Sequence, residues 1–238
     1  MAATHRYEVV VRPDLKHLEI NACLIGKPGA LIARDPKARM YLISATTADG
    51  ARRLEVDDNE ISLPTGTPCV RYRVDIRRAA ASNPRYAGID DTSIAVPTTS
   101  WLWLPSGQGA TQTVVRFKLA RQHRVSVPWE RVAAAGTEES YAIPKSPRSD
   151  AGVSAFGNFQ RCELKVGSAA LRAALLPGKY SGNQQTLLSW LADAARNVTR
   201  AYGRFPTPSP QIIVIPGARH HHDPGEPVPF GHVIRDGG

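Results

Sequence analysis

The sequence has few cysteines, no long apolar run and no recognisable secretion leader. Its 238 residues contain only 3 cysteines, Cys23, Cys69 and Cys162, which are widely spaced and form no CxxC pair. We therefore expect reduced, buried thiols in a cytoplasmic protein. No apolar run approaches the ~18 residues that a membrane helix needs. The first residues, MAATHRYEVVV, lack the basic and apolar regions of a signal peptide, so no membrane partner is predicted.

Several catalytic signatures are also missing. The chain has no G-x-S-x-G nucleophile elbow, no Walker A loop and no G-x-G-x-x-G dinucleotide loop. Sequence motifs therefore give no case for an α/β-hydrolase, a P-loop NTPase or a Rossmann dehydrogenase. The formal net charge is +9, but the cations are scattered along the chain. This pattern favours a solvated surface over a nucleic-acid partner.

What the first 160 residues do contain is a series of short strands. Residues 6–11 and 17–25 flank a Pro-Asp turn, which predicts an antiparallel hairpin. Residues 69–76 alternate apolar side chains with Arg71, Arg73 and Asp75, which is typical of a strand with one dry and one wet face. Many short strands at regular spacing predict an antiparallel β-sandwich over residues 1–160.

Two tryptophans lie in the segment TSWLWLP, which follows a long polar loop at 79–97. On a strand, Trp101 and Trp103 would share one face. They can be read as part of the rim of the β-domain core. The alternative is an exposed aromatic platform, which would make the β domain a noncatalytic module that binds a protein or glycan partner.

The pattern changes after residue 160, where we place the domain boundary. Residues 159–166 and 169–177 are predicted to be paired strands, and QIIVIP at 211–216 reads as a buried strand. A helix over 183–203 is expected between the strands 169–177 and 211–216, because Asn183 suits an N-cap and Gly203 a C-terminal stop. Strand, helix and strand would form a crossover unit. The predicted apolar face of the helix consists of Leu187, Leu191, Ala194, Val198 and Tyr202. A final strand is expected at 230–236, so residues 161–238 form a second unit of α/β type.

Acidic and histidine clusters give little evidence of a catalytic centre. Glu138-Glu139 and similar acidic pairs read as turns and solvated strand ends. His220, His221 and His222 are consecutive in a loop rich in Gly and Pro, so their side chains are expected to diverge instead of converging on a metal. We predict that this chain contains no metal site and no catalytic residue.

A resemblance to a known family rests on the order of the C-terminal segments. The helix is followed by AYGRFPTPSPQIIVIPG and then by FGHVIRDGG. This order resembles the start of the thermolysin-like catalytic domain of gluzincin zinc aminopeptidases. Those enzymes carry F-G-x-x-Y-P, D-x-V-x-x-P and G-x-M-E-N motifs in succession. The opening YEVVVRPDLKHLEI is similar to the N-terminal domain of the glycyl-aminopeptidase branch.

The resemblance implies a zinc metallopeptidase with a peptide substrate, although one motif is missing. HExxH, which binds zinc through two histidines on one helix face, does not occur in the chain. In the family it follows the strand at which this sequence ends. The sequence is therefore expected to stop before the zinc helix, and this chain alone is expected to bind no catalytic zinc and to cleave nothing.

The resemblance also implies a binding role for the last strand. In the related enzymes the equivalent edge strand borders the cleft and pairs with an extended peptide. The residues in that position are Gly231, His232, Val233, Ile234 and Arg235. Ile234 replaces the glutamate that holds a substrate's free amine in those aminopeptidases, so the resemblance also allows an endopeptidase or a noncatalytic relative.

Overall fold

The structure is a computed structural model of the 238-residue chain. It describes residues 4–26, 28–83, 91–107, 112–145, 151–178, 180, 183–207, 209–216 and 233–236. In this described part, no helix has the length and apolar character needed to cross a membrane.

The largest sheet has seven strands in the order β12-β13-β10-β1-β2-β7-β4. The strands are β1 Thr4–Val11, β2 His17–Cys23, β4 Leu42–Thr47, β7 Cys69–Asp75, β10 Gln112–Lys118, β12 Glu130–Ala135 and β13 Glu138–Ile143. The predicted hairpin is confirmed, because β1 and β2 pair antiparallel. The prediction of a purely antiparallel sandwich is wrong, because β1 pairs parallel with β10. Since these strands lie far apart in sequence, no turn between them dictates an antiparallel pairing.

Two smaller sheets and three short helical segments complete the N-terminal part. One sheet has the order β5-β6-β3-β9 and the other β11-β14-β8. Their strands are β3 Ala30–Ile32, β5 Val56–Asp57, β6 Glu60–Ser62, β8 Ser93–Pro97, β9 Leu104–Pro105, β11 Arg124–Ser126 and β14 Val153–Gly157. The helical segments are α1 Ala38–Tyr41, α2 Ile76–Ala81 and the 3₁₀ turn η1 Thr98–Ser100. Strand β8 and the second half of α2 lie in the stretch 79–97 that was predicted to be a loop, and the prediction is wrong for those residues.

A single apolar core joins the three sheets. Val70, Tyr72 and Val74 of β7 point into it, while Arg71 and Arg73 are exposed, as the alternation predicts. The small sheets contribute residues such as Leu31 and Ile61 from one and Ile94, Val125 and Phe156 from the other. The N-terminal part is therefore a β-sandwich-like domain built around one core.

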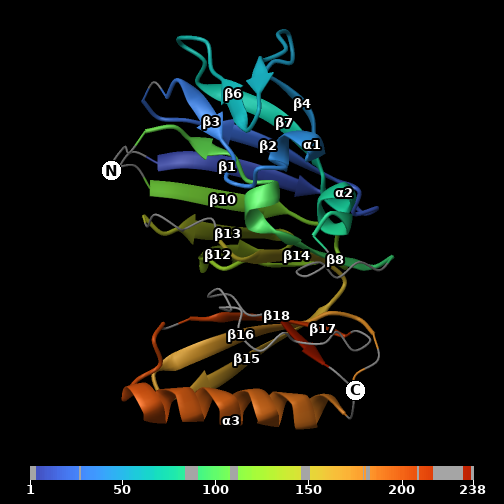
Figure 1. Cartoon of the computed structure of the whole chain (residues 1–238), viewed down its shortest axis with the longest axis vertical. Coiled ribbons are helices and arrows are strands. Elements are labelled where there is room, and N and C mark those ends of the chain that lie inside the picture. Colours follow the sequence, from blue (N-terminus) through green and yellow to red (C-terminus); the bar gives the residue numbers. More distant parts are fainter. Residues whose placement is uncertain are drawn as a thin grey trace.

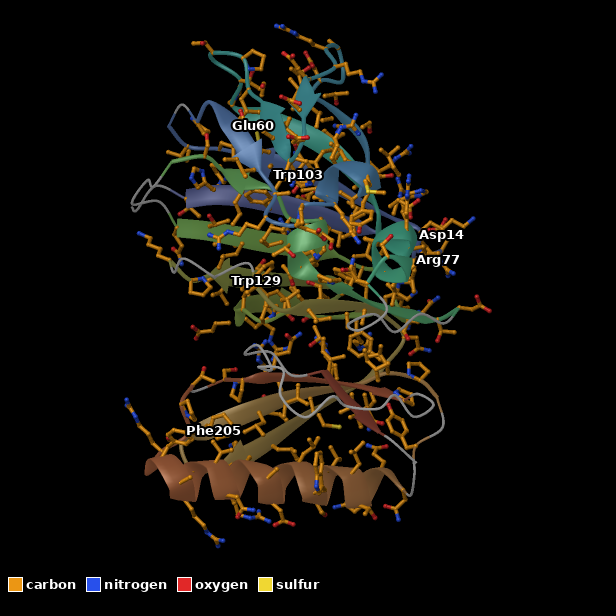
Figure 2. All side chains as sticks on the ribbon, in the orientation of Figure 1. Asp14, Glu60, Arg77, Trp103, Trp129 and Phe205 are labelled. Carbon is orange, nitrogen blue, oxygen red and sulfur yellow. A yellow bond between two sulfur atoms is a disulfide. The ribbon has the colours of Figure 1, made fainter. Side chains whose placement is uncertain are left out.

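Both tryptophans of TSWLWLP lie inside this core, as Figure 2 shows for Trp103, and both are 0% exposed. The Trp101 ring meets the rings of Phe117, Trp129 and Phe156 edge-on, with centroids 6.0–6.1 Å apart. The core interpretation is confirmed, and the exposed platform does not exist. The expected strand is wrong, because the tryptophans lie between η1 and β9.

Hydrogen bonds hold this irregular tryptophan segment in the core. The Trp101 Nε1–H donates to Ser154 Oγ at 3.1 Å, and the Tyr7 hydroxyl donates to the Trp103 carbonyl at 2.9 Å. The Trp103 amide donates to the Tyr72 hydroxyl at 3.3 Å. Because these bonds satisfy buried polar groups outside any sheet ladder, the segment can cross the core without being a strand.

The cysteine prediction needs correction, because Cys23 and Cys69 form a disulfide. They are directly opposite each other on β2 and β7, with Cα atoms 4.0 Å apart. The expectation of reduced thiols failed because spacing along the sequence says nothing of this register. Cys162 remains free. The prediction of a cytoplasmic protein, which rested on reduced thiols, stays untested.

The C-terminal part is a four-stranded sheet in the order β15-β16-β17-β18, covered on one face by a helix (Figure 1). Its elements are β15 Gln160–Val166, β16 Ala169–Leu175, α3 Gln184–Tyr202, β17 Gln211–Pro216 and β18 Val233–Asp236. Strands β15 and β16 pair antiparallel, whereas β16 pairs parallel with β17 across the intervening helix. The predicted hairpin and strand–helix–strand crossover are confirmed.

Helix α3 begins and ends where its capping residues predict. The Asn183 side chain accepts the Thr186 amide at 2.8 Å, and Gly203 has the left-handed φ of 72° that ends many helices. Leu191 and Ala195 are its buried residues. The predicted apolar face is correct at Leu191 and wrong at Tyr202, which is 73% exposed.

Reducing the Cys23–Cys69 bond is predicted to destabilise the chain. The bond closes a loop between residues that are 46 apart, and such cross-links stabilise proteins by about 2–4 kcal/mol, mainly by restricting the unfolded chain. Urea unfolding with and without reductant measures the difference, and Cys162→Ser serves as a control that keeps the bond. Three titratable thiols in the denatured, unreduced protein would show that the bond does not form.

Candidate functional site

Both faces of the C-terminal sheet are covered, and its two edge strands are β15 and β18. Ala173, Leu175 and Val214 form an apolar cluster with Leu191 of α3. On the opposite face, a second cluster joins the C-terminal sheet to the three-stranded sheet β11-β14-β8; its members are Ala95, Val153, Ala155, Phe159, Ala174, Leu176, Ile213 and Ile215. Alternating residues of β16 and β17 thus face α3 and the N-terminal part in turn.

A buried carboxylate lies beside this junction. Glu139 of β13 is 5% exposed, and its two oxygens accept hydrogen bonds from Arg161 Nη1 of β15 at 2.8 and 2.7 Å. The Tyr141 hydroxyl donates to the same carboxylate at 2.8 Å. Arg131 Nη1 lies 3.9 Å from it. A strand of the N-terminal sheet and a strand of the C-terminal sheet are therefore joined by a charge-assisted contact.

The Tyr141 hydroxyl beside Glu139 is held in its protonated form. Burial, followed by the neighbouring Glu139 carboxylate, raises the pKa of Tyr141, so its hydroxyl stays protonated and acts as a donor. Both Glu139 oxygens are engaged by Arg161, and one of them also by Tyr141. A carboxylate saturated in this way is poorly placed to take a proton from a substrate. We therefore assign Glu139 a structural role.

One further polar contact crosses the same junction, and a second lies within the C-terminal part. Gln211 Nε2 of β17 donates to Ser126 Oγ of β11 at 2.8 Å. Arg172 of β16 donates through Nη2 to the Ser209 carbonyl at 3.3 Å, and burial lowers the pKa of its guanidinium. The Gln211–Ser126 bond therefore joins β17, the neighbour of the edge strand β18, to the N-terminal part.

A cleft of about 410 Å³ opens where β15 and β16 meet the start of α3. Its lining combines apolar side chains with the polar groups of Asn158, Gln160, Tyr180 and Gln184. Among the described residues that line it there is no carboxylate, histidine or cysteine, so they offer contacts but no acid–base group of these kinds. Gly178 at its border has φ +146°, and a Cβ there would lie 2.3 Å from Pro216 Cγ. Only glycine therefore lets this loop pack against the end of β17.

The predicted binding strand is present in part. Strand β18, at one end of the sheet order, pairs parallel with β17 and places Val233 opposite Ile213, Ile234 opposite Val214 and Arg235 opposite Ile215. The expected strand at the end of the chain is thereby found at Val233–Asp236. Gly231 and His232 lie outside the described residues, as do His220–His222.

Metal ligands do not gather in the described residues. Within them, no group of three or more His, Cys, Asp or Glu side chains is placed to hold a metal ion. The described residues therefore do not fit zinc.

Sequence motifs did not identify the residues of this junction. The prediction that Glu139 is solvated is wrong, because Arg161, 22 residues away, covers it from another sheet. A charged residue at an inward-facing strand position is the one local sign of such a contact. In β13, Glu139 occupies such an inward-facing position, and its neighbours Glu138 and Ser140 are half-buried.

Removing Arg161 is predicted to destabilise the protein more than removing a surface arginine. Arg161→Ala leaves the buried Glu139 carboxylate short of its closest partner, which costs roughly 1–3 kcal/mol. Arg116→Ala removes the exposed ion pair between Arg116 of β10 and Glu138, the residue next to Glu139 on β13. Such an exposed pair contributes less than about 1 kcal/mol to stability. Urea unfolding of both variants measures the contrast, and equal losses would contradict a structural role for Glu139.

Comparison with known proteins supports the fold. Among protein-family models and curated proteins, none matches the chain. An aminopeptidase N family protein from Idiomarina loihiensis has a TM-score of 0.70 and 12% sequence identity, over 90% of this chain and 39% of its own. Two structures of an M1 zinc metallopeptidase from Deinococcus radiodurans, one with a bound Tyr-Ser-Ala substrate, match 90% of this chain and 56% of theirs. Their identities are 13% and 14%, and their TM-scores are 0.49 and 0.46.

The chain therefore spans well under half of the aminopeptidase N family protein that it matches. At 12% sequence identity the match shows a similar fold and nothing further. The resemblance indicated by the sequence is confirmed at that level: this chain has the fold of part of an aminopeptidase N family protein.

Proposed function

We propose that the chain is the N-terminal portion of a zinc-dependent, aminopeptidase-like peptidase. In this proposal residues 1–160 form the β-sandwich domain, and residues 161–238 form the first part of a thermolysin-like catalytic domain. The observation that carries it is the fold match over 90% of the chain at a TM-score of 0.70. The order of the C-terminal segments, a helix followed by QIIVIP and a last strand, supports the proposal from the sequence.

Zinc belongs to the proposed whole enzyme. A catalytic zinc polarises a peptide carbonyl and activates water for its hydrolysis. The described residues form no cluster that fits the ion, so no step of hydrolysis is assigned to them. The proposal therefore assigns no zinc ligand to the described residues.

The part assigned to this chain is binding of the peptide along β18. A strand at the edge of a sheet has main-chain N–H and C=O groups available for an added strand. Main-chain pairing gives affinity with little dependence on side chains, which suits a peptidase with varied substrates. The proposed contact residues are Gly231, His232, Val233, Ile234 and Arg235, and the packing of Gly178 on Pro216 supports the end of the adjacent strand.

A noncatalytic module for a protein or glycan partner is not favoured. It depended on an exposed face around Trp101 and Trp103. Both side chains are fully buried in the core of the N-terminal part, which leaves that alternative without its binding surface.

An extended peptide is predicted to pair with β18. Titrating an unlabelled pentapeptide into isotope-labelled protein should shift the amide resonances of Val233–Asp236 and leave those of β5 and β6 unchanged. A matched peptide that is N-methylated at alternate residues loses the donors facing β18 and should bind at least about tenfold more weakly, since each lost hydrogen bond costs roughly 1 kcal/mol or more.

Two controls sharpen this experiment. The peptide N-methylated at the other set of residues keeps the donors that face β18 and should bind as the parent does. The peptide should also be recovered intact after incubation with added zinc, because the chain is proposed to bind without cleaving. Shifts confined to other strands, or equal binding of both N-methylated peptides, would overturn the assignment of β18.

A further inference from the structure

The outer face of the seven-stranded sheet carries an excess of positive charge. Alternate residues of β1, β2, β7 and β10 point away from the core and form rows across the sheet. One row runs from Glu8 through Asn21 and Arg71 to Thr46. The next row along the strands includes Glu19 and Arg73.

Most acidic side chains on this face already have partners. Glu8 pairs with Lys118 at 2.9 Å, and Glu19 accepts two hydrogen bonds from Arg12 Nη2 at 2.9 and 3.0 Å. Glu138 pairs with Arg116. Asp75, at the end of β7, accepts the Arg78 amide at 2.9 Å and so caps α2.

Four exposed arginines on or beside this face have no acidic partner among the described residues. Arg71 and Arg73 are two positions apart on β7, so they share its outer face. Thr46 is paired with Arg71 on one side and forms an isolated β-bridge with Arg53 on the other. Arg53 and Arg71 therefore flank Thr46. Arg6 lies on β1, opposite Cys23 of the disulfide. We call Arg6, Arg53, Arg71 and Arg73 the arginine face.

Two further carboxylates lie near Arg53 in sequence. Asp49 is engaged by the Thr47 hydroxyl and by the Ala51 amide at 3.0 Å, and its pKa is lowered chiefly by the Thr47 hydrogen bond. Glu55 is exposed two residues after Arg53. Neither forms an ion pair with the arginine face in the described part of the chain, so the four guanidiniums remain available.

The chemistry of these side chains selects one kind of partner. Guanidinium groups bind carboxylates through two parallel hydrogen bonds, which lysine cannot do. The neutral residues between the arginines are Asn21, Ser44 and Thr46. Among the described residues of these rows there is no Phe, Tyr or Trp ring on which a nucleic-acid base could stack.

We propose that the arginine face docks an acidic polypeptide segment in extended form. Arg71 and Arg73 are separated along β7 by roughly 7 Å, the spacing of alternate residues on any strand. Alternate carboxylates of an extended acidic chain have the same spacing and meet both guanidiniums in register. Arg53 receives a further carboxylate from across Thr46. This surface is separate from β18 and does not depend on the peptidase proposal.

Anisotropy of a labelled peptide tests this docking. The probe is a peptide of roughly ten residues in which glutamate and serine alternate, compared with a peptide of the same composition whose glutamates form one block. The alternating peptide is expected to bind more tightly, and its affinity should fall as salt is raised. The double variant Arg71→Gln/Arg73→Gln is expected to weaken its binding by about tenfold or more, the loss of two charge-assisted contacts.

The matched control removes the same charge elsewhere. Arg200→Gln/Arg204→Gln changes two exposed arginines at the end of α3 and should leave the affinity within about twofold, since diffuse attraction alone is weak at physiological salt. Circular dichroism confirms that both variants are folded. Equal losses in the two double variants would overturn the proposal by showing attraction to net charge only. Tighter binding of a thymidine oligonucleotide or of phosphatidylserine vesicles at Arg71 and Arg73 would overturn it in favour of that partner.

Discussion

The structure depends on one apolar contact between two sheets. The three-stranded sheet β11-β14-β8 is buried on both sides, with Ile94 and Phe156 in the N-terminal core and Ala95 and Ala155 against the C-terminal sheet. These alanines let the larger Ile213 and Phe159 approach closely. Each large side chain fully buried there contributes roughly 1.5–3 kcal/mol. Helix α3 covers only one face of the C-terminal sheet, so the other face relies on this contact.

Charge is distributed so that polar groups orient the two parts while apolar groups stabilise them. The Glu139–Arg161 contact crosses the junction at its edge, where a mispaired arrangement would leave a carboxylate buried without a partner. On the outer face of the large sheet, by contrast, acidic residues are neutralised one by one and the remaining arginines are exposed. Part of the net charge of +9 therefore lies on this face as arginines without an acidic partner among the described residues.

Local signals allowed much of the C-terminal part to be predicted. The β-branched run of β17, the cap at Asn183 and the stop at Gly203 each act within a few residues, and the structure follows them. Contacts that depend on long-range register could not be predicted in this way. The Cys23–Cys69 bond needs the pairing of β2 with β7, and Glu139 needs Arg161 from a different sheet. Trp101 and Trp103 are spaced like residues on one face of a strand. Their segment is nevertheless irregular, because burial and three hydrogen bonds hold it in the core. Of the proposed peptide contacts, the strand at Val233–Asp236 was predictable, while its function rests on resemblance.

Calorimetry of the intact chain tests most directly whether the two parts form one body. If the C-terminal sheet relies on β8 and β14 for cover, the whole chain unfolds in a single transition with equal calorimetric and van't Hoff enthalpies. The helical signal of α3 and the near-ultraviolet signal of the buried tryptophans should then disappear together. Two separated transitions, with the helix lost before the tryptophan core, would show that the contact through Ala95, Ala155, Phe159 and Ile213 does not hold the edge strand in place.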